Sequence, residues 1–261
     1  MSTTNQTATP NVEYLQNGFL NLGFGDKLNK DLEMAMERKQ TDIQLHHRND
    51  YNGDIMSYTL NLKKSDKSDL YFFNSIDATL KKEGQEQEIK QSFGIKKNYG
   101  VTAKEAYNLM DGRSIEKKLY NDEGTAQTRW LKLDFENKNQ YGNYKMYRMF
   151  PYNLEREINK YPVELKNDYE KNELIRSLKK GNAQQITVEQ DGQKVKYYLS
   201  ANPAERTLDI YDANKNVVKR ELLMKQDQRK EQKQEQQQDN KQTQKNTQQK
   251  KQGQSRKNTS H

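Results

Sequence analysis

The feature that most constrains the fold is an order of local signals that recurs three times along the chain. Each time, a helix with an apolar stripe precedes three segments of alternating apolar and polar residues, at about residues 26–79, 102–150 and 167–212. Alternating segments joined by short turns pair as antiparallel strands. The sequence therefore predicts an α+β fold with up to three units, each a helix plus a three-stranded antiparallel sheet. It leaves open whether the units are duplications or a chance order.

Capping residues and glycines mark the ends of the predicted helices. Candidate N-caps stand at Asp26, Thr102 and Asn167, and the last two have a Glu three residues later, as in a capping box. Gly112 and Gly181 follow the second and third helices, where glycine readily adopts the left-handed conformation of a helix end. These signals predict where each unit begins and where its first strand follows.

Three further segments complete the local prediction. Asn52-Gly53 lies between two alternating segments, and both positions of such a turn need positive φ, so a hairpin is predicted there. Residues 87–97 alternate apolar and polar side chains and predict an additional strand. Residues 153–162 have Leu154 and Ile158 four apart and end near Pro162, which predicts a short bridging helix.

Apolar residues nearly disappear at the C-terminal end. Residues 224–261 contain one apolar side chain, Met224, in low-complexity Gln/Lys sequence. Such a segment has nothing to bury and is predicted to be disordered. The predicted organisation is a disordered N-terminus (1–17), a first unit with an extra strand (18–100), a second unit with the bridging helix (101–162), a third unit (163–223) and a disordered basic tail (224–261).

The basic surplus of the chain lies mainly in this tail. The formal net charge is +8, and the tail carries 10 Lys or Arg against 4 Asp or Glu, which leaves 35 basic and 33 acidic residues for 1–223. The units are therefore nearly neutral. A cationic segment of this kind attracts polyanions such as nucleic acids, and a solubilising tail is the alternative.

No catalytic or metal-binding pattern stands out, so we expect neither an enzyme nor a cofactor. The chain has no cysteine, and His46 and His47 are neighbours on a predicted strand, where they point to opposite faces. Gly23-x-Gly25 lacks the third glycine of a dinucleotide loop. A calcium-like loop from residue 212 has Val217 where the bend requires glycine.

Membrane and export signals are likewise missing from the sequence. The opening residues MSTTNQTATP have neither a basic nor an apolar segment, and no apolar run approaches the length of a membrane span. A cytoplasmic protein without membrane contact is the expectation.

Two stretches resemble a known group of sequences. GRSIEKKLYNDEGTAQTRWLKLDFENKNQYGNYKM and LIRSLKKGNAQQITVEQDGQKVKYYLSANPAERTLDIYD are similar to an uncharacterised family encoded on conjugative transposons of Bacteroidetes, whose members have a domain of unknown function and a polar Gln/Lys-rich C-terminus. The resemblance covers residues 100–220 well and 18–100 more loosely. Related modules attached to topoisomerase-like proteins imply work on DNA, and the family supplies no catalytic residues.

Aromatic and basic residues interleave on two predicted strands, a pattern that suits stacking on unpaired bases and contact with phosphates. The candidate nucleic-acid contacts are Arg129, Trp130, Lys132, Tyr144, Lys145, Tyr147 and Arg148 on the strands, and Lys225, Arg229, Lys230, Lys250, Lys251, Arg256 and Lys257 in the tail. The alternative for Trp130 and about half of the tyrosines is the core, because alternation buries one face of each strand.

The sequence thus predicts a non-catalytic accessory protein of a mobile genetic element that binds DNA or RNA. The alternative is a protein-interaction or scaffold module, with a protein partner in a conjugation or DNA-processing complex and no direct contact with nucleic acid.

Overall fold

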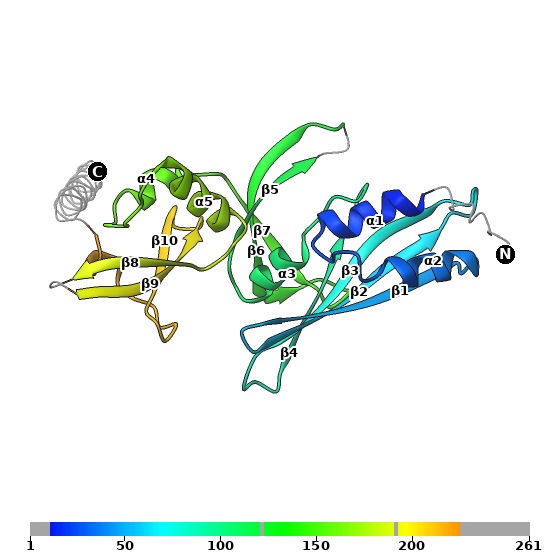
Figure 1. Cartoon of the computed structure of the whole chain (residues 1–261), viewed down its shortest axis with the longest axis horizontal. Helices are drawn as coiled ribbons and strands as arrows, with labels where there is room; N and C mark the ends of the chain where they lie inside the picture. The colour runs from blue at the N-terminus through cyan, green and yellow to red at the C-terminus, as the bar shows by residue number, and fades with distance from the viewer. Residues whose placement is uncertain (1–10, 121–122, 191–192, 225–261) are drawn as a thin grey trace, which may run out of the picture.

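The computed structural model describes residues 11–120, 123–190 and 193–224. This part of the chain contains five α-helices, a short 3-10 helix and three antiparallel sheets of four, three and three strands. The three sheets follow one another along an elongated molecule, with the first and third units at opposite ends (Figure 1). The predicted α+β class is confirmed.

The first unit combines two helices with a four-stranded meander. Helices α1 and α2 span Val12–Asn21 and Asn29–Glu37, and the strands lie in chain order as β1 (Asp42–Tyr51), β2 (Asp54–Lys64), β3 (Tyr71–Lys81) and β4 (Glu88–Gly94). Asn52 and Gly53 have φ angles of 57° and 91°, so the predicted hairpin turn joins β1 to β2. Strand β4 is the additional strand predicted within residues 87–97.

The second and third units each have one helix ahead of a three-stranded meander. Helix α3 (Ala103–Met110) precedes β5 (Ile115–Tyr120), β6 (Ala126–Lys138) and β7 (Tyr144–Met149). The predicted bridging helix is α4 (Leu154–Ile158). Helix α5 (Asp168–Lys179) precedes β8 (Gln184–Gln190), β9 (Gln193–Asn202) and β10 (Thr207–Tyr211), and the 3-10 helix η1 (Arg220–Leu222) follows. The middle strand of each of these sheets is also the middle one in sequence.

Two predictions at the start of the chain are wrong. Disorder over residues 1–17 fails for residues 12–17, which lie in α1, where the apolar Leu15 and Phe19 are fully buried one helical turn apart; residues 1–10 lie outside the described residues. Asp26 does not cap α2, because the N-cap position is Leu28 and no side-chain cap is formed. Asp26 instead accepts the Asn29 amide with its backbone carbonyl at 3.0 Å.

The caps of the two later helices match the sequence. Thr102 and Glu105 form a reciprocal capping box on α3, and the Asn167 side chain accepts the Glu170 amide on α5.

At the other end of the chain, Met224 is buried in the core although the sequence places it in the tail. The prediction of disorder for the rest of the tail, from residue 225, lies outside the described residues.

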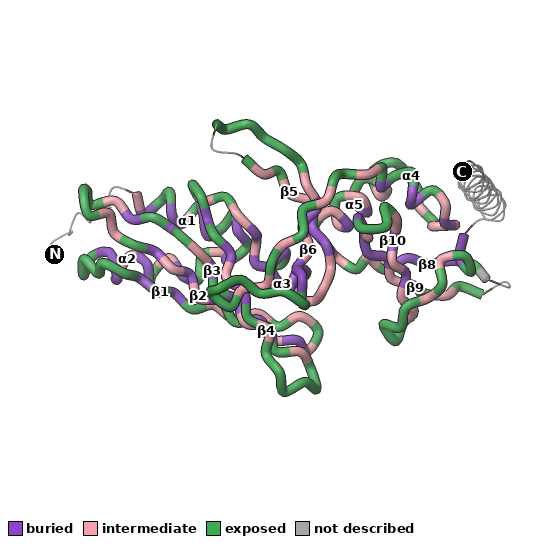
Figure 2. Tube along the Cα trace, turned by 180° about the vertical axis from the view of Figure 1, so that it is seen from behind, coloured by how far each residue is buried: buried purple, intermediate pink, exposed green. Residues whose placement is uncertain are grey.

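Strand β6 connects two hydrophobic cores. Leu131 and Leu133 project from one face into the core formed with the first unit, whereas Trp130 projects from the other face into the core of the third unit. Helix α3 is similarly enclosed, with every residue except Lys104 buried. In Figure 2 the buried stretches of α3 and β6 lie in the middle of the molecule. The second unit therefore supplies the surfaces on which its neighbours pack.

A polar contact fixes the third unit to the end of α3. Asn108 is fully buried, and its side-chain amide donates to the Lys180 carbonyl at 2.7 Å and to Asn182 at 3.0 Å. The Arg113 guanidinium donates to the Gly181 carbonyl at 2.8 Å. Gly181 has φ +80°, and a Cβ added there would lie 2.8 Å from the Ser114 carbonyl oxygen. A side chain has no room at this junction.

We expect Gly181→Ala to destabilise the protein by about 1–3 kcal/mol more than Gly142→Ala, because only the former adds overpacking to backbone strain. Gly142 is a matched control, since its φ is also +80° and no heavy atom lies within 4 Å of the added Cβ. Urea unfolding followed by circular dichroism measures both. Equal losses in the two variants would show that the junction is not tightly packed.

Candidate functional site

Trp130, the aromatic residue central to the predicted strand surface, is not on the surface. Its exposed fraction is 0%, its ring lies 5.7 Å from that of Tyr152, and its Nε1 has no hydrogen-bond partner. The sequence pattern suggested one solvated face for β6, but the third unit covers that face. Trp130 is therefore a core residue, and its assignment to a stacking platform is wrong.

The other predicted strand residues divide between the two faces of the second sheet. In the register of β6 and β7, Lys132 stands opposite Tyr147, and Asp134 stands opposite Lys145. The candidates Lys132, Tyr147 and Lys145 therefore lie on the same face of the sheet as Trp130. Arg129 and Arg148 lie on the other face of the sheet. Their register partners on the neighbouring strands are Lys117 and Leu131, respectively. These side chains do not converge on a single surface.

The tyrosines and Arg129 of this predicted set are engaged in local contacts. The hydrogen bond to Asp134 raises the pKa of the Tyr147 hydroxyl. Tyr144 is half-buried, its ring 4.9 Å from that of Phe135, and the Arg129 guanidinium lies 4.5 Å from the Phe150 ring. The tail candidates, Lys225, Arg229, Lys230, Lys250, Lys251, Arg256 and Lys257, lie outside the described residues.

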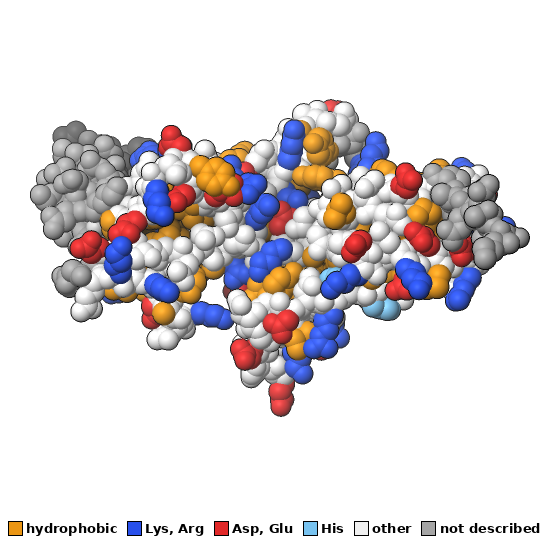
Figure 3. Space-filling model, viewed as in Figure 1, with side chains coloured by type: hydrophobic (Ala, Val, Ile, Leu, Met, Phe, Trp, Pro, Cys, Tyr) orange, Lys and Arg blue, Asp and Glu red, His pale blue; other side chains and the backbone are white. Residues whose placement is uncertain are grey.

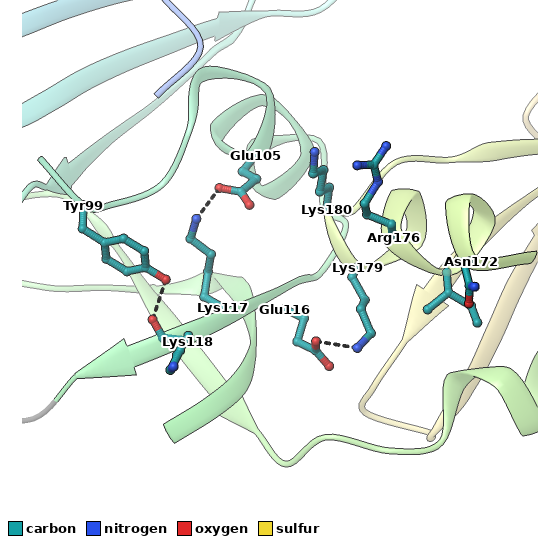
Figure 4. Close-up of a pocket in the computed structure, with 10 residues that line it drawn as sticks. Tyr99, Glu105, Glu116, Lys117, Lys118, Asn172, Arg176, Lys179 and Lys180 are labelled. Atoms are coloured by element: carbon teal, nitrogen blue, oxygen red, sulfur yellow. Dashed lines mark hydrogen bonds and ion pairs between the residues drawn. The ribbon is translucent and has the colours of Figure 1, made fainter. Parts of the chain in front are cut away.

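A pocket of about 380 Å³ lies where the loop before α3, strand β5 and helix α5 meet (Figure 4). Five of its lining side chains are basic: Lys117, Lys118, Arg176, Lys179 and Lys180. Glu105 and Glu116 are its two carboxylates, so the lining has a surplus of three positive charges. The pocket arises because α5 packs beside β5 of the preceding sheet as well as beside its own strands β8 and β9.

Two of these five cations are neutralised within the pocket. Lys117 pairs with Glu105 at 2.8 Å, and Lys179 pairs with Glu116 at 2.9 Å. Arg176 pairs with Glu173, which does not line the pocket. Figure 4 shows Arg176 and Lys180 extending from α5 in the same direction. Together with Lys118, they supply the positive charge that a negatively charged ligand would meet.

Two exposed tyrosines border the basic pocket. Tyr99 and Tyr120 are 41% and 52% exposed, and their rings lie 5.7 Å apart in an edge-to-face arrangement. The Tyr99 hydroxyl donates to the Lys118 carbonyl at 2.6 Å, which holds this ring in place. Burial of the hydroxyl, followed by the proximity of Tyr120, raises the pKa of Tyr99, so the donating proton is retained. We call these two residues the tyrosine pair.

Cations lie beside both members of the tyrosine pair. The Lys117 ammonium is 5.2 Å from the Tyr99 ring centroid, and the Lys118 ammonium is 5.7 Å from that of Tyr120. Figure 3 shows hydrophobic and basic side chains together on the projecting β5–β6 hairpin. The sequence contains the same aromatic and basic interleaving here, in KKLY, as in the strands that the prediction selected. Only the fold shows that Tyr99 and α5 come close to it.

Other candidate chemistry is structural in the described residues. His46 bonds Thr59 at 3.1 Å, whereas His47 packs its ring 5.5 Å from Phe24 on the other face. No group of three or more His, Cys, Asp or Glu residues within 11–120, 123–190 and 193–224 could hold a metal ion. In the same ranges, no helix combines the length and apolar character that a bilayer crossing requires.

Comparisons of the chain with protein-family models, with curated proteins and with solved structures found no match. The resemblance to the transposon-encoded family therefore stays a prediction.

The burial of Trp130 predicts its fluorescence. As the single tryptophan, it should emit at shorter wavelength than free tryptophan and resist acrylamide quenching. Trp130→Ala should cost about 3–5 kcal/mol of unfolding free energy. The double variant Trp130→Phe/Phe135→Trp moves the indole to a position that is 40% exposed and should be readily quenched. Strong quenching of the wild type would contradict the packed position.

Proposed function

We propose that the protein is a non-catalytic binder of single-stranded nucleic acid, with the basic pocket and the tyrosine pair as its contact surface. The observation that carries this proposal is a pocket lined by five cations and two carboxylates that also includes Tyr99, whose exposed ring contacts the exposed ring of Tyr120. Cations follow the phosphates of a strand, and ring faces stack on unpaired bases for about 1–3 kcal/mol per base. A duplex hides its base faces, so this arrangement favours single strands.

The hydroxyl anchor of Tyr99 supports this assignment. An exposed aromatic ring usually loses conformational entropy when it stacks on a ligand. The 2.6 Å hydrogen bond to the Lys118 carbonyl limits that loss, since the ring is already held next to the pocket. Ring and cations can then engage neighbouring parts of one nucleotide chain.

The predicted tail adds a second, less specific contribution. Its 10 basic residues against 4 acidic ones provide long-range attraction to phosphates. In this proposal the tail raises affinity for any polyanion, whereas the pocket and tyrosine pair supply the preference for unpaired bases. The resemblance to transposon-encoded sequences supports a setting in DNA processing or transfer of a mobile element.

A protein-interaction role is the second candidate. Strands β1 and β8 each lie at one edge of their sheet, with ten and seven residues. Outer strands offer unpaired backbone groups to which an extended segment of another protein can add. This reading requires no contact between the basic pocket and nucleic acid.

We expect Tyr120→Ala to weaken binding of a single-stranded oligonucleotide by roughly 5- to 150-fold, through the loss of one stacked base. Arg176→Ala/Lys180→Ala should reduce the slope of log affinity against log salt by about 1.4, because two phosphate contacts are lost. Fluorescence anisotropy with single-stranded and duplex oligonucleotides over a salt series measures both effects.

The control for charge is Lys63→Ala/Lys196→Ala, which removes two exposed lysines that do not line the pocket and should leave the pocket contribution intact. A chain that ends at Met224 lacks the tail, so its affinity compared with that of the full chain gives the contribution of the tail. If that truncation abolishes binding while the pocket variants bind like the wild type, the pocket assignment is wrong. If no form binds but a protein partner co-purifies, the interaction role replaces it.

A further inference from the structure

Lys104 occupies an unusual position on α3 and is not among the residues that line the basic pocket. It is the one residue of α3 that is not buried. Its Nζ nevertheless lies 4.1 Å from the ring centroid of Tyr51 and 4.4 Å from that of Tyr107. The two rings stack on each other with centroids 4.4 Å apart. The amine is thus accessible to solvent and also packed against two aromatic rings.

Both rings are held by hydrogen bonds from the first sheet. The Tyr107 hydroxyl donates to Asp54 Oδ2 at 2.9 Å, and Asp54 Oδ1 accepts the Glu83 amide at 2.9 Å. Asn49 donates to the Tyr51 hydroxyl at 3.2 Å. The amine of Lys104 therefore packs against two rings that are themselves held in place by hydrogen bonds.

The charges around Lys104 do not pair with it. Asp111 is engaged by Lys82 at 2.6 Å and by Arg113. Within residues 11–120, 123–190 and 193–224, no carboxylate lies at ion-pair distance from Lys104. The Arg113 guanidinium lies 5.3 Å from the Tyr107 ring, and Lys104 is in the first turn of α3, where the helix dipole is positive.

These surroundings favour the neutral amine over the ammonium ion. Partial burial, followed by repulsion from Arg113, lowers the pKa of Lys104 to about 8, while Asp111 acts in the opposite direction. Aromatic ring faces stabilise a cation, whereas desolvation of the amine acts in the opposite direction. A neutral amine has a free lone pair and is the nucleophilic form of lysine.

We propose that Lys104 is an acyl-acceptor site, at which a solvent-accessible amine held on two stacked tyrosine rings reacts with small acyl phosphates or thioesters. The amine nitrogen attacks the acyl carbon and a C–N bond forms. The C–O bond of an acyl phosphate breaks, or the C–S bond of a thioester, and phosphate or thiolate leaves with the electron pair. The nitrogen releases one proton to water, and no oxidant or reductant is needed.

Acylation has a structural consequence at this position. The product is a neutral amide, so the protein loses one positive charge and the packed ammonium no longer has to be kept partly desolvated. The modified side chain can remain on the tyrosine rings, because an amide carries apolar groups that pack there. This inference does not depend on nucleic-acid binding.

The test treats the full-length protein with limiting acetyl phosphate and quantifies acetylation at each lysine by mass spectrometry. At pH 8 about half of the Lys104 amines are neutral, against fewer than about 1% for a lysine with the ordinary pKa of about 10.4. We expect initial acetylation at Lys104 to exceed that at the exposed Lys63 by at least about 10-fold. The Lys104 rate should level off above pH 8, whereas the Lys63 rate should continue to rise toward pH 10.

Two substitutions of Tyr51 separate this site from simple exposure. Tyr51→Ala removes one ring, increases the hydration of the amine and should raise its pKa, so acetylation at pH 7 should fall several-fold. Tyr51→Phe keeps the ring and should leave the rate near that of the wild type. If Lys104 in the wild type reacts no faster than Lys63, or shows the same pH profile, the proposal is overturned. A rate unchanged in Tyr51→Ala would also overturn it.

Discussion

The enclosure of α3 is the constraint on which the rest of the structure depends. A helix buried on nearly every side needs small residues for close approach and partners for its polar groups. Ala103 and Ala106 are almost fully buried, and Tyr58 donates to the Ala103 carbonyl at 2.8 Å. Asn108 is satisfied by the backbone of the third unit. The same short helix is therefore held by both the first and the third units.

This arrangement explains why the basic pocket lies between units rather than within one. Helix α5 packs beside β5 of the preceding sheet, and the loop before α3 brings Tyr99 to the same strand. Three segments that are far apart in sequence then surround one space. A unit of one helix and three strands, taken alone, contributes only one wall of it.

Local signals in the sequence predict local structure well, because their physical causes are local. The capping box at Thr102, the cap at Asn167 and the Asn52-Gly53 turn each depend on backbone groups within a few residues. The burial of Trp130 depends on what covers the second sheet. Strand alternation alone does not distinguish a face exposed to solvent from a face covered by another unit. For the same reason the sequence did not reveal the pocket, since Arg176 lies on a different unit from Tyr99.

The lysines of β5 have an alternative explanation, which is that they protect an outer strand of the second sheet from pairing with other chains. The Gln91 side chain accepts the Tyr144 amide at 2.8 Å, so the β7 edge is approached by β4 and β5 is left as the other outer strand. Lysines commonly protect such edges from pairing with other chains, and Lys117 and Lys118 fit that role.

Edge protection does not account for the remaining charges. Arg176 and Lys180 belong to α5 and its end and have no strand to protect, yet they line the same pocket as Lys117 and Lys118 (Figure 4). Nor does it account for Tyr99 and Tyr120, since exposed aromatic rings next to an open edge increase the risk of association. The proposed ligand, an unpaired nucleotide chain, carries both negative charge and flat apolar faces, and so would match basic side chains from two units together with exposed rings.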